Sequence, residues 1–275
     1  MSKVKYMSEN KNIRVADAFK NGKAFIPFIT CGDPDLKTTA ALVKEMEKNG
    51  ADLIELGIPF SDPTAEGPVI QGANLRSLTG GTTTDKIFAM VKELRSEISI
   101  PLIFMTYANV VYSYGILSGS EPCEAFARNA AEAGINGVIL ADVSYEEKNE
   151  FAPVFRKYGI DFISMIAPTS EERISVIAKE AEGFIYVVSS MGVTGMRSEI
   201  TTDIGVMTAR IREANPDVPC AVGFGISTPA QAADMAQYAD GVIVGSAIVN
   251  IIAEHGTSSA PYIAGYVRSM KDAIS

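Results

Sequence analysis

Short runs of consecutive apolar residues recur along the chain, each bounded by turn-forming residues and followed by a longer amphipathic stretch. The runs are rich in Ile, Val and Phe and are mostly continuous rather than alternating, which is typical of parallel strands covered on both faces. The pattern therefore predicts eight parallel strands. They are expected at residues 24–31, 51–58, 101–107, 137–143, 161–167, 183–188, 219–224 and 240–244.

The stretches between these runs show helical spacing. Apolar side chains recur on one helical face at positions 87, 90, 91 and 94, and again at 204, 207 and 211. Capping boxes mark two helix starts, one at 169–172 and one at 228–231. We also expect a closing helix over 258–275 and a short extra helix before residue 24. The inner face of that first helix would carry Ile13, Ala16 and Phe19.

Eight strands that alternate with helices predict an α/β protein built as a (β/α)8 TIM barrel with an extra N-terminal helix. An open doubly wound sheet is the competing architecture, but residues 30–34 after the first strand lack its glycine-rich turn. Long loops are expected after the second strand, from Pro59 past Gly81, and after the sixth strand. No linker or shift in composition divides the chain, so residues 1–275 are expected to form one domain.

Composition and charge argue against several classes of function. The 24 basic and 33 acidic residues give a net charge of −9, which disfavours nucleic acid or an anionic membrane as the main partner. No apolar run is long enough to span a membrane, and residues 1–20 lack a signal-peptide core, so we expect a cytoplasmic protein.

The rare residues argue against further kinds of site. His255 is the only histidine and is expected at a helix C-terminus, so a multi-histidine metal site or a Ser-His-Asp triad is disfavoured. The three cysteines are far apart, and we expect Cys31, Cys123 and Cys220 to be reduced and buried. No metal is therefore expected, and acid–base chemistry falls mainly to Asp, Glu, Tyr or Lys.

Two acidic residues stand out around the second predicted strand. Glu55 lies inside an otherwise apolar run, where burial would raise its pKa and prepare it to exchange protons near neutral pH. The alternative is a structural Glu paired with a Lys or Arg. Glu66, in the loop that follows, is either a solvated loop residue or a second carboxylate brought in when the loop closes over a substrate.

Glycines mark the ends of the last three predicted strands, in the segments 189–195, 223–227 and 245–249. In barrels, the loops after the last two strands and a helix N-terminus commonly bind phosphate through main-chain N–H groups. The hydroxyl of Ser246 could both cap the following helix and donate to the anion. The alternative is three ordinary strand-to-helix turns, since no Lys or Arg belongs to these segments.

Taken together, these segments resemble the α subunit of tryptophan synthase. The strongest part is residues 55–71, which resemble the family's signature almost throughout. The supporting parts follow in the family's order and cover nearly the whole predicted barrel. They are residues 25–34, 105–109, 192–195, 223–227 and 245–249.

The resemblance implies a retro-aldol cleavage of indole-3-glycerol phosphate to indole and glyceraldehyde 3-phosphate. It also implies a β subunit that receives the indole within an αββα heterotetramer and that alone holds pyridoxal phosphate, with no cofactor in this chain. Glu55 matches the family's general acid and base, and Glu66 the second catalytic carboxylate. The phosphate-contacting positions are occupied by Gly195, Gly225, Gly245 and Ser246. The substrate-pocket positions are occupied by Phe28, Tyr107, Tyr186 and, in the mobile sixth loop, Thr194.

Two positions depart from the family pattern. Glu66 stands where the family has aspartate, and its extra methylene moves the carboxylate by roughly one bond, a misplacement that can lower a rate about 10²-fold. We nevertheless expect Glu66→Asp to leave activity unchanged or raised. Ser144 stands where the family has proline, in a region that faces the partner subunit in relatives, and it is expected to cap the following helix.

These departures keep other functions open. The chain could be a catalytically weak subunit that mainly activates its β partner, or a lyase that releases indole without a partner. A different phosphosugar barrel, such as an isomerase, would share the late glycines but not residues 55–71.

Overall fold

The structure is a computed structural model that describes residues 13–116, 119–170, 173–189 and 203–275. Nine parallel strands form one sheet in the order β5-β4-β3-β2-β1-β9-β8-β7-β6. The predicted α/β barrel is confirmed, because every predicted run contains a strand. The strands are β1 (Ala24–Thr30), β2 (Ile54–Gly57), β3 (Leu102–Thr106), β4 (Gly137–Leu140), β5 (Asp161–Phe162), β6 (Ser164–Ile166), β7 (Ile185–Val188), β8 (Cys220–Gly223) and β9 (Gly241–Val244).

The fifth predicted run is split into β5 and β6 by a single residue, Ile163. β5 pairs with β4 on one side, and β6 pairs with β7 on the other. The N–H of Ile163 donates to the carbonyl of Val138 at 2.9 Å, so the chain passes from one neighbour to the other without leaving the sheet. The two short strands therefore act as one barrel strand and bring the two ends of the sheet order together.

Both faces of the strands are buried, which explains why the apolar runs are continuous. Side chains such as Ile26, Ile103 and Ile243 point inward and fill the barrel lumen. Their neighbours along the chain, such as Phe25 and Phe104, point outward into a larger core beneath the helices. Adjacent side chains on a strand face opposite sides, so a run covered on both sides must be apolar throughout.

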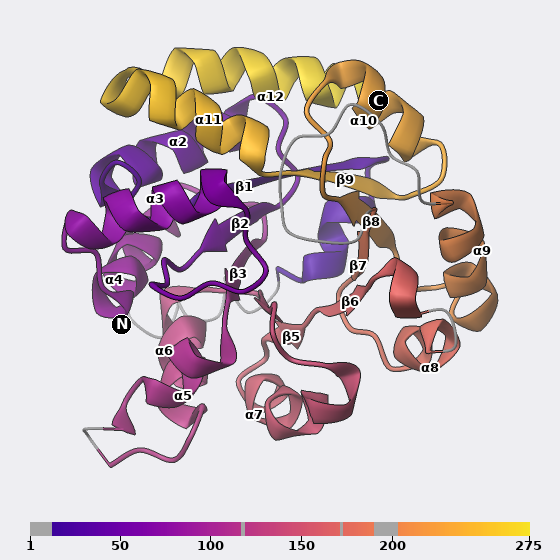
Figure 1. The fold of residues 1–275 in the computed structure, drawn as a ribbon, viewed down its shortest axis with the longest axis horizontal. Helices are drawn as coiled ribbons and strands as arrows, with labels where there is room; N and C mark the ends of the chain where they lie inside the picture. The colour runs from indigo at the N-terminus through magenta and orange to yellow at the C-terminus, as the bar shows by residue number, and fades with distance from the viewer. Residues whose placement is uncertain (1–12, 117–118, 171–172, 190–202) are drawn as a thin grey trace.

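The helices lie around the strands, with α2, α11 and α12 on one side of the barrel and α7, α8 and α9 on the other (Figure 1). The α-helices are α2 (Leu36–Lys48), α3 (Pro68–Thr79), α4 (Thr84–Leu94), α5 (Ala108–Ser113), α6 (Glu124–Ala133), α7 (Ala152–Lys157), α8 (Ile174–Lys179), α9 (Ile204–Ala214), α10 (Pro229–Ala236), α11 (Ser246–His255) and α12 (Ala260–Ile274). The 3-10 helices are η1 (Val15–Phe19), η3 (Tyr145–Glu150), η4 (Pro168–Ser170) and η5 (Gly256–Ser258).

The predicted helical faces lie where the spacing places them. The apolar positions 87, 90, 91 and 94 are buried in α4, and 204, 207 and 211 are buried in α9. The capping box at the start of α10 is confirmed by Thr228, whose hydroxyl accepts the Gln231 N–H and whose own N–H donates to the Gln231 side chain. The other predicted capping box, at 169–172, ends at Glu172, which lies outside the described residues.

The N-terminal segment of the described chain forms the five-residue 3-10 helix η1. Its buried residues are Val15 and Ala18, which lie three apart as a 3-10 helix requires, whereas Ala16 is only half-buried. The inner face that we predicted from α-helical spacing was therefore wrong at Ala16. Phe19 packs against Phe184, with ring centroids 5.6 Å apart, and η1 covers the N-terminal end of the lumen.

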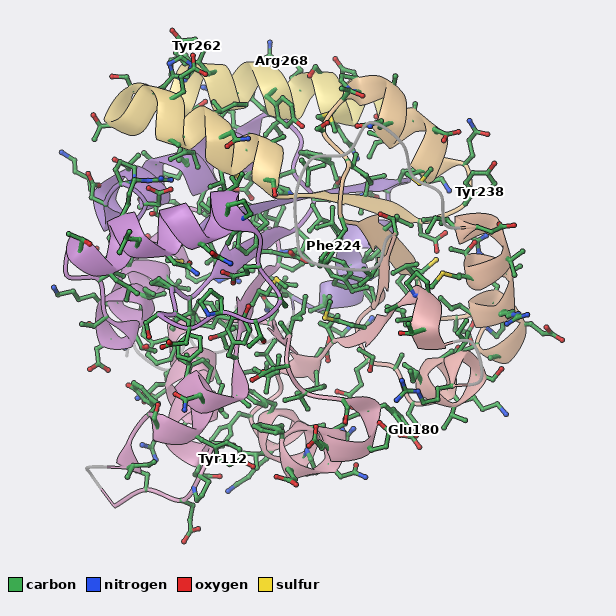
Figure 2. The ribbon with its side chains drawn as sticks, viewed as in Figure 1. Tyr112, Glu180, Phe224, Tyr238, Tyr262 and Arg268 are labelled. Atoms are coloured by element: carbon green, nitrogen blue, oxygen red, sulfur yellow. The ribbon has the colours of Figure 1, made fainter. Side chains whose placement is uncertain are left out.

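The rare residues occupy structural positions. Cys31, Cys123 and Cys220 are free and buried, as expected. His255 ends α11, also as expected, and stacks on Tyr262 at a centroid separation of 3.6 Å. In Figure 2, Tyr262 lies at the edge of the molecule, whereas Phe224 lies near its centre. Among the described residues, no helix combines the length and apolar character needed to cross a membrane.

Candidate active site

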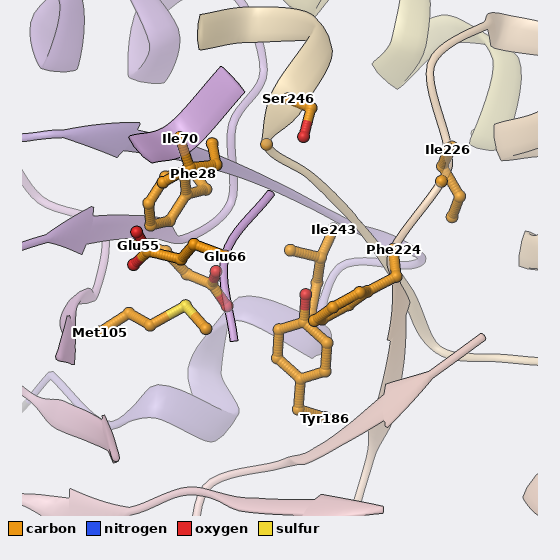
Figure 3. A pocket seen from close by; sticks show the side chains of 12 residues that line it. Phe28, Glu55, Glu66, Ile70, Met105, Tyr186, Phe224, Ile226, Ile243 and Ser246 are labelled. Carbon is orange, nitrogen blue, oxygen red and sulfur yellow. The ribbon is translucent and has the colours of Figure 1, made fainter. Parts of the chain in front are cut away.

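One cavity opens at the carboxyl ends of the strands. It is lined by inward-facing side chains of β1, β2, β3, β7 and β9, and by the segments that follow β2, β8 and β9. The cavity encloses about 510 Å³, part of it open to solvent. Figure 3 shows the carboxyl groups of Glu55 and Glu66 among Phe28, Met105 and Tyr186. Strands that are parallel end at the same face of the barrel, so residues far apart in the sequence meet here.

Glu55 projects from β2 into this cavity and is almost completely buried. Its Oε1 atom has no hydrogen-bond partner among the described residues, and none of their Lys or Arg side chains pairs with it. The alternative of a structural ion pair therefore finds no support in the described part of the chain. Removal from water raises the pKa of Glu55 to about 8, because the charged form loses its hydration.

Glu66 lies in the loop between β2 and α3 and is half-buried. Its Oε2 atom accepts a 2.6 Å hydrogen bond from the side-chain amide of Asn74. The Tyr107 hydroxyl also interacts with the Glu66 carboxylate and accepts the Ala65 N–H at 3.2 Å. Burial raises the pKa of Glu66 to about 6, against the opposing effect of the two hydrogen bonds. The loop thus holds the carboxylate at the cavity rather than in solvent.

The two carboxyl groups differ in protonation near neutral pH. With pKa values of about 8 and about 6, Glu55 is mostly protonated where Glu66 is mostly ionised. A pair of carboxyl groups whose environments separate their pKa values can supply a proton donor and a negative charge in one site. This arrangement suits a reaction in which one atom of a substrate gains a proton while positive charge is stabilised elsewhere.

Sequence reasoning missed Asn74, which lies on the buried face of α3. A buried amide must find partners, so an Asn within a buried helical face was the available signal. Its partner could not be read from the sequence, because the Glu66 carboxylate reaches it only through the path of the loop.

The predicted phosphate residues that the structure describes lie together on another side of the cavity. Gly225 follows β8, and Gly245 and Ser246 follow β9 at the start of α11. The free N–H groups and the dipole of a helix N-terminus attract anions. A Cβ atom at Gly245 would lie 3.3 Å from the Phe28 ring, so the absence of a side chain here lets the main chain pass close to that ring. Gly195 lies outside the described residues.

Aromatic side chains form part of the cavity wall. Phe28 on β1 lies beside Glu55 in the strand register and packs over Gly57, where a Cβ atom would lie 2.6 Å from the ring. Tyr186 on β7 packs edge-on against Phe224, with ring centroids 5.9 Å apart. Burial, together with the charge of Glu55, raises the pKa of the Tyr186 hydroxyl well above its ordinary value.

Two predicted pocket residues remain, Tyr107 and Thr194. Tyr107 is buried and packs against Phe60 in a tilted arrangement, with ring centroids 5.2 Å apart. It supports the loop and is not among the residues that line the cavity. Thr194 lies outside the described residues. No group of three His, Cys, Asp or Glu side chains that could hold a metal ion occurs in the part of the chain that is described.

The buried Glu55 should make the protein less stable as pH rises. The unfolded carboxyl ionises near its ordinary pKa of 4.5, whereas the folded one stays protonated up to about 8. The unfolded state therefore binds fewer protons across this window, and the free energy of unfolding falls as pH rises. We expect Glu55→Gln to be more stable than the native protein by several kcal/mol above this window and no different below it. Urea unfolding of both proteins across the window measures this, and a difference that is independent of pH would contradict it.

Comparisons with known proteins identify one family over nearly the whole chain. The family described as tryptophan synthase alpha chain matches residues 15–274. A curated relative from Lacticaseibacillus casei, named tryptophan synthase alpha chain, is 46% identical over 261 residues, which cover 95% of each chain. A solved structure of Mycobacterium tuberculosis tryptophan synthase is similar with a TM-score of 0.82 and 32% identity, covering 95% of this chain and 98% of that one. A structure of the tryptophan synthase a2b2 complex from Pyrococcus furiosus is similar with a TM-score of 0.78 and 33% identity, covering 90% and 98%.

Proposed function

The chain belongs to the tryptophan synthase alpha chain family, whose reaction is the cleavage of indole-3-glycerol phosphate, and we propose that Glu55 and Glu66 carry out this reaction here. The observation that carries the proposal is a cavity in which the buried Glu55, whose Oε1 has no hydrogen-bond partner among the described residues, faces the glycine-rich ends of β8 and β9. The retro-aldol reaction makes the protein a carbon–carbon lyase.

The proposed mechanism assigns a task to each carboxyl group. Cleavage needs a proton on indole C3 and the removal of a proton from the glycerol 3′-hydroxyl. Glu55, which is mostly protonated near neutral pH, supplies the first proton and as a carboxylate then accepts the second. Glu66 is ionised at that pH and accepts a hydrogen bond from the indole N–H, which stabilises positive charge as it develops at the nitrogen.

The remaining cavity residues bind and orient the substrate. Gly225, Gly245 and Ser246 offer main-chain N–H groups to the phosphate. We propose Gly195, in the chain segment after β7, as a further phosphate contact, and Thr194 beside it as a residue of the substrate pocket. The −9 net charge repels a phosphorylated substrate at long range, so directed donors must supply the local attraction. Phe28 and Tyr186 lie against the planar ring system, and Tyr107 holds the Glu66 carboxylate.

We further propose a β subunit as partner, in an αββα heterotetramer, with pyridoxal phosphate bound only by the β subunit. The support is the similarity to the Pyrococcus furiosus a2b2 complex. Ser144, in the region expected to face that partner, precedes η3 and donates its hydroxyl to Glu147 at 3.0 Å. This contact fixes the start of η3 where a proline would have fixed the backbone instead. A cytoplasmic location and a single domain over residues 1–275 complete the proposal.

Indole release by the purified chain, measured with and without an added β subunit, tests this function. We expect slow release by the chain alone and strong stimulation by the β subunit, because the partner orders the site around its substrate. High turnover without a partner would instead identify a stand-alone lyase. No turnover in either state, with β-subunit activity still stimulated, would identify a degenerate activator.

A further inference from the structure

We propose that Ser189 is a positioning residue for phosphate binding: its hydroxyl holds the turn after β8 so that the Gly225 N–H points toward the start of α11. The proposal rests on the proposed function, in which Gly225, Gly245 and Ser246 bind the substrate phosphate. Ser189 directly follows β7, is completely buried and is not among the residues that line the cavity. Its effect on a substrate must therefore pass through its neighbours.

Ser189 makes two hydrogen bonds to successive residues of the neighbouring strand end. Its N–H donates to the carbonyl of Gly223 at 3.0 Å, and its hydroxyl donates to the carbonyl of Phe224. In an extended strand, successive carbonyl groups point to opposite sides, so one neighbouring residue could not bind both. The backbone must turn between them for Ser189 to reach the second carbonyl.

Phe224 makes that turn by adopting a left-handed conformation with φ of +75°. This region is unfavourable for residues other than glycine, and a bulky aromatic residue is uncommon there. The structure around Phe224 must therefore hold the conformation in place. The hydroxyl of Ser189 supplies a hydrogen bond on the main chain, and the packing of the Phe224 ring against Tyr186 supplies a contact on the side chain.

The direction of the Gly225 N–H follows from the same bond. The Phe224 carbonyl and the Gly225 N–H belong to one trans peptide unit and point in opposite directions. Because the carbonyl is held toward β7, the N–H faces the side of β9, the other neighbour of β8 in the sheet. Gly245 and Ser246 follow β9, so the three main-chain groups converge on one side of the cavity.

Removal of the Ser189 hydroxyl should let the turn relax and rotate this peptide unit. We expect Ser189→Ala to raise KM for indole-3-glycerol phosphate about tenfold, as is typical for one lost hydrogen bond to a charged group. The turnover number should change by less than about twofold, because the phosphate is bound alike in the ground and transition states. Binding of indole alone, which carries no phosphate, should not change.

Ser164→Ala is the matched control. Ser164 is another buried serine, on the adjacent strand β6, and its hydroxyl has no hydrogen-bond partner among the described residues. Titration with inorganic phosphate, followed by amide NMR, gives a direct readout. We expect the Gly225 amide to shift in the native protein and in Ser164→Ala but not in Ser189→Ala. The Ser246 amide should respond in all three proteins.

The outcomes separate this proposal from the function on which it rests. If neither the Gly225 nor the Ser246 amide of the native protein responded to phosphate, the proposed phosphate site itself would be wrong. A native response that Ser189→Ala retains, with KM unchanged, would overturn only the positioning role. An equal loss of phosphate and indole binding in Ser189→Ala would also overturn it, because the residue would then support the barrel as a whole.

Discussion

Replacement of Glu55 by glutamine is expected to abolish indole formation, with the turnover number falling by about 10⁴-fold, the upper end for a positioned acid or base. The loss should be this large because one side chain serves both proton transfers in the proposed mechanism. Glutamine keeps the size and hydrogen-bonding shape of the protonated carboxyl group but cannot give up or accept a proton. Measurement of indole release from saturating indole-3-glycerol phosphate tests the expectation.

The fold and the substrate site should survive this substitution. Within the described parts of the chain, Oε1 of the buried Glu55 has no hydrogen-bond partner, so the substitution removes no contact of that atom there. We therefore expect Glu55→Gln to bind inorganic phosphate as the native protein does. Glu213→Gln, which makes the same chemical change at an exposed position of α9, serves as the control and should retain full activity. An active Glu55→Gln variant would refute the assignment of the catalytic acid.

The same residue links stability to catalysis. Burial of the Glu55 carboxyl group, with no Lys or Arg partner among the described residues, lowers stability above pH 4.5, the ordinary pKa of a glutamate. The same burial raises its pKa into the range where it can donate a proton. A Lys or Arg partner would relieve the loss of stability, but it would also lower the pKa of Glu55 again. Glu55→Gln should therefore gain stability as it loses activity, and the two measurements together distinguish a functional carboxyl group from a poorly packed one.

The sequence predicted the barrel because both faces of each strand are buried, and continuous apolar runs show that directly. The predicted burial of Glu55 is also confirmed, because both faces of β2 are covered. The run alone did not show whether its side chain enters the lumen or the outer core. The sequence could not predict the break at Ile163, because the side chains of residues 161–167 fit one continuous strand equally well. The break depends on how the two ends of the sheet meet, which no local pattern records.

The supporting residues were less predictable than the strands. Asn74 and Ser189 act through hydrogen bonds to residues that lie on other elements, namely Glu66 in a loop and Phe224 at a strand end. Their residue types permit such bonds at many positions, and only the tertiary arrangement selects one. The left-handed conformation of Phe224 was hidden for a similar reason, because local preference would place a glycine there. The residues that we propose to contact a substrate were thus easier to single out in the sequence than those that we propose to orient them.

The acid limb of the pH profile provides the second large expected effect, through Glu66. The rate of the native enzyme at low substrate concentration should follow a bell-shaped curve. It falls below about pH 6, where Glu66 becomes protonated, and above about pH 8, where Glu55 loses the proton that it must donate. Glu66→Gln should lower kcat/KM about 10²-fold at the optimum, because a neutral amide stabilises the developing charge poorly. It should also remove the acid limb while leaving the alkaline limb in place.

Two controls decide whether the limb belongs to Glu66. The substrate phosphate loses its second proton near pH 6 as well, at about the same pKa as Glu66, so an acid limb that persists in Glu66→Gln would belong to the substrate. Glu66→Asp keeps the charge and should keep both the limb and at least the native activity. A collapse of Glu66→Asp would instead show that the loop depends on the longer side chain, whose Oε2 lies 2.6 Å from the Asn74 amide. In that case Asn74→Ala should also lower activity, because both changes break the Asn74 contact and leave Tyr107 alone to hold the carboxylate at the cavity.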